Sequence, residues 1–458
     1  MHARSLLLAL ALSTPFAGCS APPADAPIPV EALRADLEAW EAAVRERHPR
    51  WSGRADDSVL AQAFDDVAAT IDTPLDRHEA FRRFSTLNPV FRDAHTLLMP
   101  TSVPPDGGDA ALFPFDLRVD GDRLFLRRGW RRESDGLALA AGTEILAINA
   151  LPTDALLAGM ARHGHGETAS LRTHMLAVMF GDWLHALHGW TKHFDVRFAG
   201  LRGGALRVST NDGWVPEVGD TARWTPSLDA LSPDVAWLRL PTFDVDDDPD
   251  RFAEAIDALF ATIRESGYRG LVIDVRGNTG GQSEAGAVVA RYLIDRPMTP
   301  VSIARERLHD GNNGMFGWRG APGSVRDIEL GDEGVVEPLA PTHRFNGRIV
   351  LMVDAMTYSA AIVFATMLQD HGVATLVGQS TGGFGNQTGN MEPFVLPATG
   401  LLAYIPAREF VRPSGDPRLA PVSPDVEMPT SGQVRDAALE RARRIASGES
   451  PPTTPAAP

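Results

Sequence analysis

The stretch Gly270–Gly281 reads GLVIDVRGNTGG, and it contains a short apolar run, Leu271 to Val275, that ends in a glycine-rich turn. Because an apolar run bounded by turn residues is typical of a fully buried strand, we expect a central strand here. Glycines directly after a strand let the backbone approach a ligand closely and turn its N–H groups outward. The stretch therefore predicts a buried strand that brings backbone donors to a site.

A second apolar run, Ile349 to Val353, is followed by TYSAA at positions 357–361 and by a predicted apolar helix from Ala360 to Leu368. A serine between a strand and a helix has two interpretations. Its side chain can cap the helix by accepting hydrogen bonds from the N–H groups of the first turn. Alternatively, Ser359 is a nucleophile whose attack those same N–H groups assist. Helix-cap statistics favour the cap when the serine is considered alone.

The order of three motifs favours the second interpretation. DVRGNTGG (274–281), TYSAA (357–361) and VGQSTGG (377–383) together resemble the core of the S41 serine peptidases, over roughly Asp234 to Asp425. That family contains the C-terminal processing proteases, the tricorn core protease and the retinoid-binding repeat proteins. The resemblance implies an α/β fold with a crotonase/ClpP-like ββα catalytic domain, a peptide or unfolded protein substrate, and Ser359 as the nucleophile.

The segment Asp93-Ala94-His95-Thr96 precedes a short apolar strand and resembles the Asp-Gly-His-Thr segment of the tricorn-like branch. In that branch the histidine is the general base. Taken alone, one of thirteen histidines near a strand start is more often structural. The resemblance implies His95 as the base, and an imidazole with a pKa near ~6.5 suits this proton transfer at neutral pH.

Lysine usage separates two mechanisms within the family. Tail-specific members use a lysine within a Gly-x-x-Thr-x-Gly-Lys-Gly pattern, whereas this chain has Phe384 at the lysine position. Lys192 is the only lysine in the sequence and lies far upstream. We therefore expect a Ser–His rather than a Ser–Lys mechanism.

The resemblance and the strand-to-turn pattern point to the backbone N–H groups of Gly280, Gly281 and Ala360 as the oxyanion hole. Hydrogen bonds from such groups stabilise the negative charge that develops on the carbonyl oxygen.

The chain departs from the tricorn-like pattern at two positions. The glutamate that precedes Pro-Asp-Val in that branch falls near Arg418, and Ala94 replaces the serine before the histidine. Asp93 and Asp416 both remain candidates for the residue that orients the base. These departures keep a second function class open, a non-catalytic peptide- or ligand-binding lipoprotein on the same fold.

The N-terminus has the layout of a secretory signal. Arg4, the apolar run Leu6 to Leu12 and the sequence Ala17-Gly18-Cys19 follow one another in a segment too short to span a membrane. It resembles a bacterial lipoprotein signal, which implies lipidation of Cys19 and a cell-envelope location with a membrane anchor. The alternative is an ordinary signal with an incidental cysteine. Cys19 is the only cysteine, so no intramolecular disulfide is expected.

Composition excludes several other classes. The formal net charge is −16 and is spread along the 458 residues, which argues against a nucleic-acid partner. The glycines of 277–281 lack G-x-G-x-x-G spacing, and no Gly-Lys pair exists, so neither a dinucleotide fold nor a P-loop is expected. Six histidines between 163 and 193 have no H-E-x-x-H or cysteine companions, so we expect no metal and no other cofactor.

These patterns divide the chain into a signal (1–19), a linker (20–29), a helical cap ending in the His95 segment (30–100), a PDZ-like and connecting β-rich region (101–230), the catalytic domain (231–430) and a C-terminal helix with a disordered tail (431–458). The run GTEILAIN at 142–149 resembles the last part of a PDZ-like domain, which can bind a peptide along its sheet edge. We also expect a hairpin around Asp120-Gly121-Asp122, a strand over 190–198, a polar insertion over 305–342, and a hairpin-like pair at 391–396 and 401–405. Strands alternate with helices between Val235 and Val377, which predicts a parallel-rich α/β core.

Overall fold

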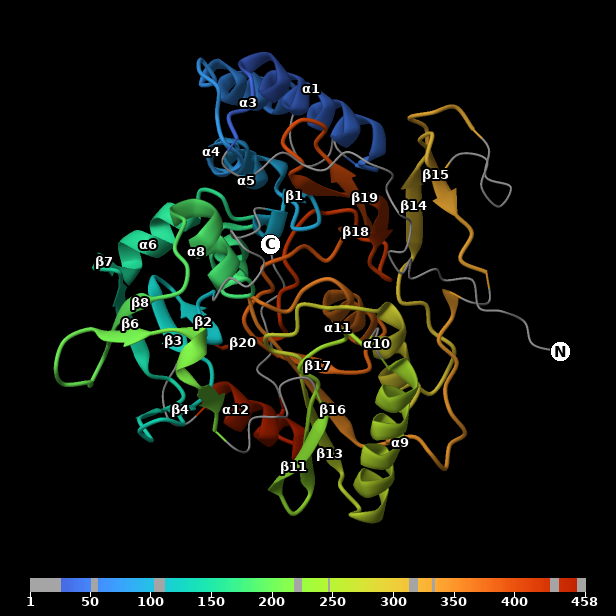
Figure 1. Ribbon diagram of the computed structural model, residues 1–458. Coiled ribbons are helices and arrows are strands. Elements are labelled where there is room, and N and C mark those ends of the chain that lie inside the picture. Colours follow the sequence, from blue (N-terminus) through green and yellow to red (C-terminus); the bar gives the residue numbers. More distant parts are fainter. Residues whose placement is uncertain are drawn as a thin grey trace.

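The computed structural model describes residues 26–50, 57–102, 112–217, 225–245, 248–312, 320–331, 334–428 and 436–450. Cys19 with the rest of the signal-like segment, most of the predicted linker and the tail from 451 onward lie outside these residues. No helix within the described ranges is both long and apolar enough to cross a bilayer. Figure 1 shows the N-terminal helices, a β-rich module and the sheet that carries α11 as neighbouring parts.

The N-terminal region is helical because its apolar residues recur every three or four positions. Leu33, Leu37, Trp40 and Val44 form the buried face of the first helix, as this periodicity predicts. The Trp40 ring packs edge-on against Phe64 of the next long helix. The region consists of α1 (Val30–Arg47), α3 (Asp57–Ala69), α4 (Arg77–Phe84), η1 (Ser85–Leu87) and α5 (Asn88–Phe91), followed by β1 (Leu97–Leu98) and η2 (Pro100–Ser102).

The β-rich module contains an antiparallel sheet with the order β2-β3-β6-β8-β9 and β7 paired to β6. Its strands are β2 (Leu117–Asp120), β3 (Arg123–Leu126), β6 (Glu144–Ile148), β7 (Leu151–Pro152), β8 (Phe194–Phe198) and β9 (Leu206–Val208). A smaller sheet contains β4 (Trp130–Arg132), β5 (Ala138–Leu139) and β10 (Trp214–Pro216), and η3 (Thr210–Asp212) precedes β10. The predicted hairpin around Gly121 is confirmed, with this glycine at φ 65°.

Three helices complete the module: α6 (Thr153–Met160), α7 (Ala169–Met175) and α8 (Phe180–His188). The predicted strand over 190–198 starts only at Phe194, so its first four residues were assigned wrongly. Gly189, at φ 68°, ends α8, and the chain turns again at Lys192, at φ 66°. The positive φ of Lys192 is incompatible with an extended strand through 190–193, and the apolar Trp190 concealed this turn in the sequence.

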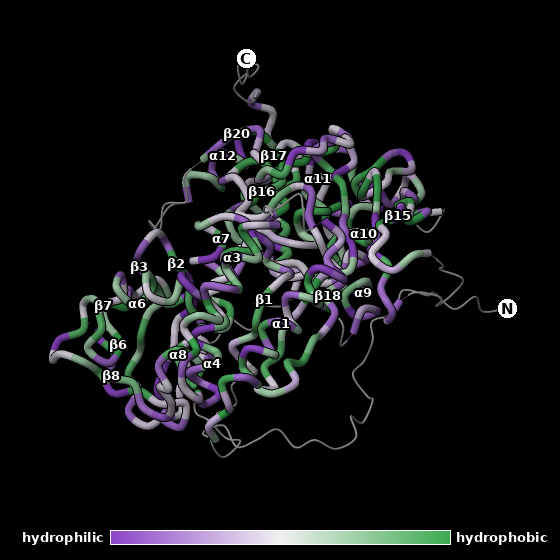
Figure 2. The backbone as a smooth tube through the Cα atoms, turned by 90° about the horizontal axis from the view of Figure 1, so that it is seen from above, coloured by the Kyte–Doolittle hydropathy of each residue, from purple (hydrophilic) through white to green (hydrophobic). Residues whose placement is uncertain are grey.

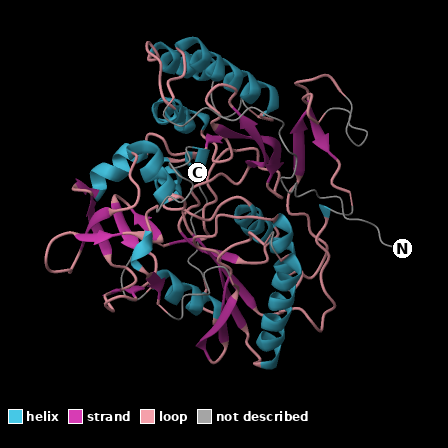
Figure 3. Cartoon of the chain, in the orientation of Figure 1, coloured by secondary structure: helices cyan, strands magenta, loops and turns pink. Residues whose placement is uncertain are grey.

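The sheet that carries the glycine bend has the order β11-β12-β13-β16-β17-β20. Its strands are β11 (Ser227–Ser232), β12 (Val235–Arg239), β13 (Gly270–Asp274), β16 (Arg348–Val353), β17 (Thr375–Gly378) and β20 (Val426–Glu427). All neighbours are parallel except β11 with β12, so the predicted parallel α/β core is confirmed. Helices α9 (Pro249–Glu265), α10 (Ser283–Ala290), α11 (Ala360–Asp370) and α12 (Ala437–Ala446) complete this layer (Figure 3).

Helices cover both faces of the parallel sheet, which explains why its strands are apolar without alternation. Leu271 and Ile273 of β13 belong to the core with α9, α10 and α11. Val272, between them, belongs to the core with α12. α11 is apolar on nearly all sides because it lies inside the molecule (Figure 2). Burial of each such side chain contributes about 1.5–3 kcal/mol to folding.

A second sheet connects the N-terminal region to the C-terminal half. It has the order β1-β19-β14-β15, with β18 paired to β19, and consists of β14 (Ile303–Arg307), β15 (Val325–Ile328), β18 (Gln387–Val395) and β19 (Leu402–Val411) besides β1. The predicted hairpin at 391–396 and 401–405 is present, but β18 already begins at Gln387 and β19 continues to Val411, so its open end is longer than predicted. The polar insertion predicted over 305–342 contains β15 and the end of β14, whose Ala304 and Glu306 are buried in alternation.

Candidate active site

Ser359 stands between β16 and α11 in a strained backbone conformation. Its φ is 53° and its ψ is −124°, a region that residues with a Cβ rarely occupy. Its side chain makes no capping hydrogen bond to α11. Instead, its Oγ lies 3.2 Å from Nε2 of His95. The hydroxyl thus points away from the helix axis toward an imidazole, as a nucleophile requires.

The glycine bend packs directly against this serine. A Cβ on Gly280 would lie 2.7 Å from Cβ of Ser359 and 2.9 Å from the nitrogen of Ala360, so only glycine permits the approach. The N–H of Gly280 donates to Oδ1 of Asn278 at 2.8 Å. Among the described residues, neither Gly281 nor Ala360 has a hydrogen-bond partner for its N–H. These two N–H groups, next to Gly280 and to Ser359 in the chain, are therefore available as donors to a ligand oxygen.

Asp354 joins the two motif turns. Its Oδ1 accepts the N–H groups of Gly277, Met356 and Thr357, each at 3.0 Å. Thr357 in turn donates its hydroxyl to the carbonyl of Val275 at 3.1 Å. These bonds connect the end of β13 to the turn after β16, so the glycine bend and Ser359 are held as one unit.

His95 reaches the site from the loop between α5 and β1. Its side chain is 5% exposed, and β1 pairs with β19 on the second sheet. Asp93 holds the loop, because its Oδ1 accepts the backbone N–H of His95 at 3.0 Å. The imidazole therefore approaches Ser359 from the opposite side to the parallel sheet.

Asp93 is fully buried and accepts several hydrogen bonds. Its carboxylate accepts Nε2–H of His48 at 2.9 Å and the hydroxyls of Thr388 at 2.8 Å and Thr96 at 3.2 Å. Nδ1 of His48 accepts the backbone N–H of Arg50, which assigns the proton of this ring to Nε2. Asp93 is thus built into the His95 loop, whereas Asp416 forms an ion pair with the exposed Arg418 at 2.6 Å.

Two hydroxyl groups face the other ring nitrogen of His95. The Tyr358 hydroxyl lies 3.0 Å from Nδ1, and Thr388 Oγ1 lies 3.4 Å from it. The same Tyr358 hydroxyl donates to Oε1 of Glu167 at 3.1 Å, and Glu167 is 3% exposed. Sequence reasoning missed Glu167 and Thr388, which belong to no recognisable motif. It also gave no role to Tyr358, although this residue lies within the TYSAA motif.

The histidines of the 163–193 stretch do not converge on a metal site; within the described ranges, no group of three or more His, Cys, Asp or Glu side chains has metal-ligand geometry. Burial lowers the pKa of His165 to about 4, with a smaller contribution from the nearby His95. Burial likewise lowers the pKa of His163 to about 4. Both rings are therefore neutral at pH 7. Lys192 is exposed in the turn before β8 and makes no described contact with Ser359.

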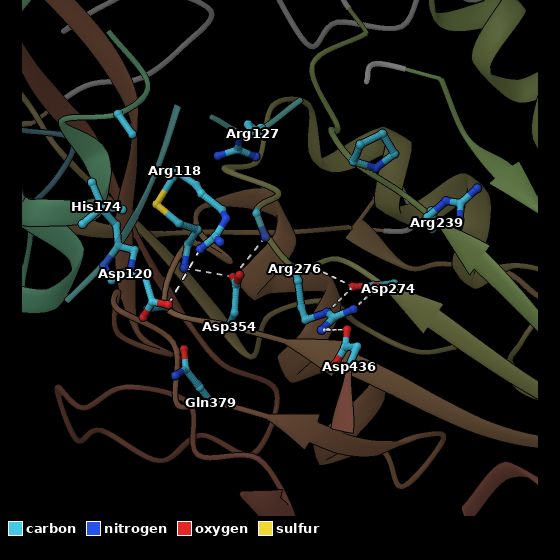
Figure 4. Close-up of a pocket in the computed structure, with 16 residues that line it drawn as sticks. Arg118, Asp120, Arg127, His174, Arg239, Asp274, Arg276, Asp354, Gln379 and Asp436 are labelled. Atoms are coloured by element: carbon cyan, nitrogen blue, oxygen red, sulfur yellow. Dashed lines mark hydrogen bonds and ion pairs between the residues drawn. The ribbon is translucent and has the colours of Figure 1, made fainter. Parts of the chain in front are cut away.

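A cavity of about 460 Å³ lies at the carboxyl edge of the parallel sheet, where it meets the β-rich module (Figure 4). On one wall Arg276 pairs with Asp274 and Asp436. On the other, Figure 4 shows Arg118 and Arg127. A smaller cavity of about 210 Å³ shares several of these residues and extends along Gly277 and Thr279, one residue before Gly280.

Arg118 and Arg127 differ from the other arginines of the cavity in their partners. Arg118 lies 3.7 Å from the Asp120 carboxylate and stacks on the Phe125 ring. Arg127 lies 3.7 Å from Asp116 and donates Nε–H to the carbonyl of Leu117. Both ion-pair distances exceed hydrogen-bond length, so each guanidinium keeps N–H donors for a ligand.

A serine and a histidine that meet beside a glycine bend, at the carboxyl edge of a parallel sheet, are typical of serine hydrolases. Residues 234–428, which contain both the glycine bend and Ser359, match the model of peptidase family S41.

One curated relative and two solved structures are also similar to this chain. The chain is 27% identical over 224 residues to the chloroplastic C-terminal processing peptidase of Tetradesmus obliquus; the match covers 49% of this chain and 41% of that protein. The crystal structure of mature CPAF has a TM-score of 0.62 at 15% identity, covering 91% of this chain and 96% of the other. The structure of mature CPAF complexed with lactacystin has a TM-score of 0.61 at 16% identity, with 91% and 98% covered. At such identities the two structures establish a shared fold.

Proposed function

We propose that this protein hydrolyses peptide bonds, with Ser359 as the nucleophile and His95 as the general base. The observation that carries the proposal is the 3.2 Å separation between Oγ of Ser359 and Nε2 of His95. This is within the reach that proton abstraction needs. Phe384 at the family's lysine position, and the exposure of Lys192 in another module, support a Ser–His rather than a Ser–Lys mechanism.

The reaction proceeds in two stages. Nε2 of His95 takes the hydroxyl proton while Oγ of Ser359 forms a bond to the substrate carbonyl carbon. The C–N bond then breaks as the imidazolium returns the proton to the leaving amine, which leaves an acyl-serine. Water, deprotonated by the same imidazole, hydrolyses this ester and restores the enzyme.

Backbone donors stabilise the charge on the carbonyl oxygen during both stages. The N–H of Gly280 is bonded to Asn278, so of the three donors expected from the sequence we assign the oxyanion hole to Gly281 and Ala360. The N-terminal end of α11 adds a partial positive charge at Ala360. The strained φ of Ser359 accompanies a hydroxyl that faces His95 instead of capping α11.

We extend the proposal to the substrate. An extended peptide that crosses Ser359 enters the cavity beside Gly277 and Thr279, because the cavity continues the glycine bend. The spare donors of Arg118 and Arg127 favour a substrate carboxylate in this cavity. We also propose that the module of β2 to β9 is PDZ-like, and that the sheet carrying β13 is crotonase/ClpP-like, in line with the S41 match.

The proposed location is the cell envelope, with a lipid anchor at Cys19. This proposal is supported by the signal-like sequence alone. It predicts that the protein partitions into the detergent phase on cloud-point extraction, and that Cys19→Ser moves it to the aqueous phase. Aqueous partitioning of the unsubstituted protein would contradict the anchor.

The hydrolase proposal is tested with an unfolded protein substrate such as reduced casein. We expect peptides to accumulate with the purified protein, and no peptides to form with Ser359→Ala or His95→Ala. Lys192→Ala is the matched control and retains the full rate. Equal cleavage by Ser359→Ala and the unsubstituted protein would overturn the proposal.

A further inference from the structure

Among the described contacts of the His95 ring nitrogen that faces away from Ser359, two hydroxyl groups lie closer than the Asp93 carboxylate. Nδ1 lies 3.8 Å from the nearer oxygen of Asp93. The closest oxygen is the Tyr358 hydroxyl at 3.0 Å, and Thr388 Oγ1 follows at 3.4 Å. The usual direct contact between histidine and carboxylate is therefore replaced by contacts to hydroxyl groups.

The protons of these hydroxyls decide which tautomer His95 adopts. Each hydroxyl has a single proton, and an ionised carboxylate is a stronger acceptor than a neutral imidazole. Tyr358 donates its proton to Glu167 at 3.1 Å, and Thr388 donates its proton to Asp93 at 2.8 Å. Both oxygens consequently offer lone pairs to Nδ1, so Nδ1 must be the protonated nitrogen.

Tyr358 is the better placed of the two acceptors. The Tyr358 hydroxyl lies 3.0 Å from Nδ1, whereas Thr388 Oγ1 lies 3.4 Å from it. The rings of Tyr358 and His95 are also neighbours, with centroids 4.9 Å apart. Asp93 already receives donors from His48, Thr96, Thr388 and the His95 backbone, so it acts on the loop rather than on Nδ1.

We propose that Tyr358 and Glu167 are the positioning residues of His95. Nδ1–H donates to the Tyr358 hydroxyl, which in turn donates to Glu167. These two hydrogen bonds keep the proton on Nδ1, so Nε2 presents its lone pair to Ser359. The proposal rests on the proposed hydrolase function. When Nε2 takes the serine proton, the charge of Glu167 stabilises the imidazolium through the hydroxyl, and no proton leaves Tyr358.

Among the described residues, the charged and titratable groups around the imidazole include Asp93 with its partner His48, Glu167 with the nearby Arg172, and His165. His165 is neutral at pH 7 because burial lowers its pKa to about 4. Burial also lowers the pKa of Arg172, while Glu167 acts to raise it, which indicates that Arg172 and Glu167 interact electrostatically. The carboxylates of Asp93 and Glu167 are thus the negative charges that the imidazolium senses.

The test measures kcat, KM and the pH profile of kcat/KM for Glu167→Gln and Tyr358→Phe. We expect each variant to lower kcat by roughly ten- to a hundred-fold with little change in KM, less than the ~10⁴-fold seen when a directly bonded carboxylate is neutralised. Glu167→Gln also moves the acidic limb to lower pH, because the imidazolium loses a stabilising charge. Glu167→Asp keeps the negative charge and should return the acidic limb of the pH profile part of the way toward its original pH. A purely structural role of Glu167 would not produce this return.

Tyr292→Phe is the matched control, since Tyr292 donates to Asp257 at 2.9 Å in another tyrosine–carboxylate pair. It should leave kcat and the acidic limb unchanged. Nitrogen NMR of labelled histidine adds a readout that needs no turnover. We expect the Nδ1–H tautomer of His95 in the unsubstituted protein and a mixture of tautomers in Glu167→Gln and Tyr358→Phe.

The outcomes separate this proposal from the hydrolase function. If Ser359→Ala is inactive while Glu167→Gln and Tyr358→Phe retain kcat, the acidic limb and the Nδ1–H tautomer, the positioning role is wrong. If Ser359→Ala remains active, the hydrolase function is wrong, and the tautomer measurement still decides whether Tyr358 and Glu167 set the state of His95.

Discussion

Nε2 of His95 lies 3.2 Å from Oγ of Ser359, although 264 positions separate the two residues in the chain. His95 is held by the sheet that contains β1 and β19, and Ser359 by the turn between β16 and α11. The pair forms only where these two layers meet. Its geometry therefore depends on packing between the layers as well as on each local motif.

The strained backbone of Ser359 gives a prediction about stability. Ser359→Gly should be more stable than Ser359→Ala by about 1 kcal/mol, because glycine tolerates φ 53° and ψ −124° at lower cost. Chemical denaturation of both variants measures the difference in unfolding free energy. Ser447 is the control position, since its φ of −74° is ordinary and glycine there should be less stable than alanine. An alanine variant at 359 as stable as the glycine variant would argue against strain.

Asp93 and Asp416, between which the sequence could not choose, should differ sharply in their contribution to the unfolding free energy. Asp93→Ala leaves buried donors of His48, Thr96 and Thr388 without their acceptor, and should lower the unfolding free energy by about 3–5 kcal/mol. Asp416→Ala should change it little, because its ion pair with Arg418 is largely solvated. Asp93→Asn keeps the shape of the side chain, so its unfolding free energy should lie between those of the two alanine variants. Similar unfolding free energies for the two alanine variants would be inconsistent with the Asp93 network.

Arg118 and Arg127 give a prediction about substrate selection. The double variant Arg118→Ala, Arg127→Ala should raise KM for a peptide with a carboxylate roughly five- to twenty-fold, because charge-assisted hydrogen bonds are lost. KM for the corresponding amide, and kcat for both peptides, should change little. Arg123→Ala is the control, since this arginine bonds to Glu144 and does not line the cavity. An equal rise in KM for the carboxylate and amide peptides would refute the proposal that Arg118 and Arg127 bind a substrate carboxylate.

His165 gives a prediction about pH. Its pKa of about 4 in the folded protein lies below the ordinary value of 6.5 in the unfolded chain. The unfolded chain therefore binds more protons between these values, and stability is complete above pH 6.5 and decreases as the pH falls toward 4, by up to about 3 kcal/mol. His165→Phe should flatten this dependence, and the same change at the exposed His193 should not. An unaltered pH dependence in His165→Phe would contradict the assignment.

The sequence predicted the elements whose signal is local. The apolar run of β13, the glycine bend and the helix after Ser359 each follow from short patterns, and so does the hairpin of β2 and β3. The parallel order of the strands followed from their alternation with helices. β14 and β15 were missed because they are polar and no short turn joins them. β14 lies between β15 and the distant β19 in one sheet.

The surroundings of His95 could not be predicted in the same way. Tyr358 is adjacent to Ser359, but Glu167 and Thr388 come from a loop before α7 and from β18, and only the folded chain brings them together. Nothing in the spacing of Asp93 and Asp416 distinguishes a buried carboxylate from a solvated one. Such choices depend on tertiary packing, which single-sequence patterns do not encode.

The most direct test of the central claim is covalent labelling by a fluorophosphonate probe, followed by mass spectrometry of the labelled peptide. The account predicts modification of Ser359, its loss in Ser359→Ala, its suppression in His95→Ala, and unchanged labelling in Lys192→Ala. A folded protein that is not labelled, or that is labelled equally well after Ser359→Ala, would contradict it.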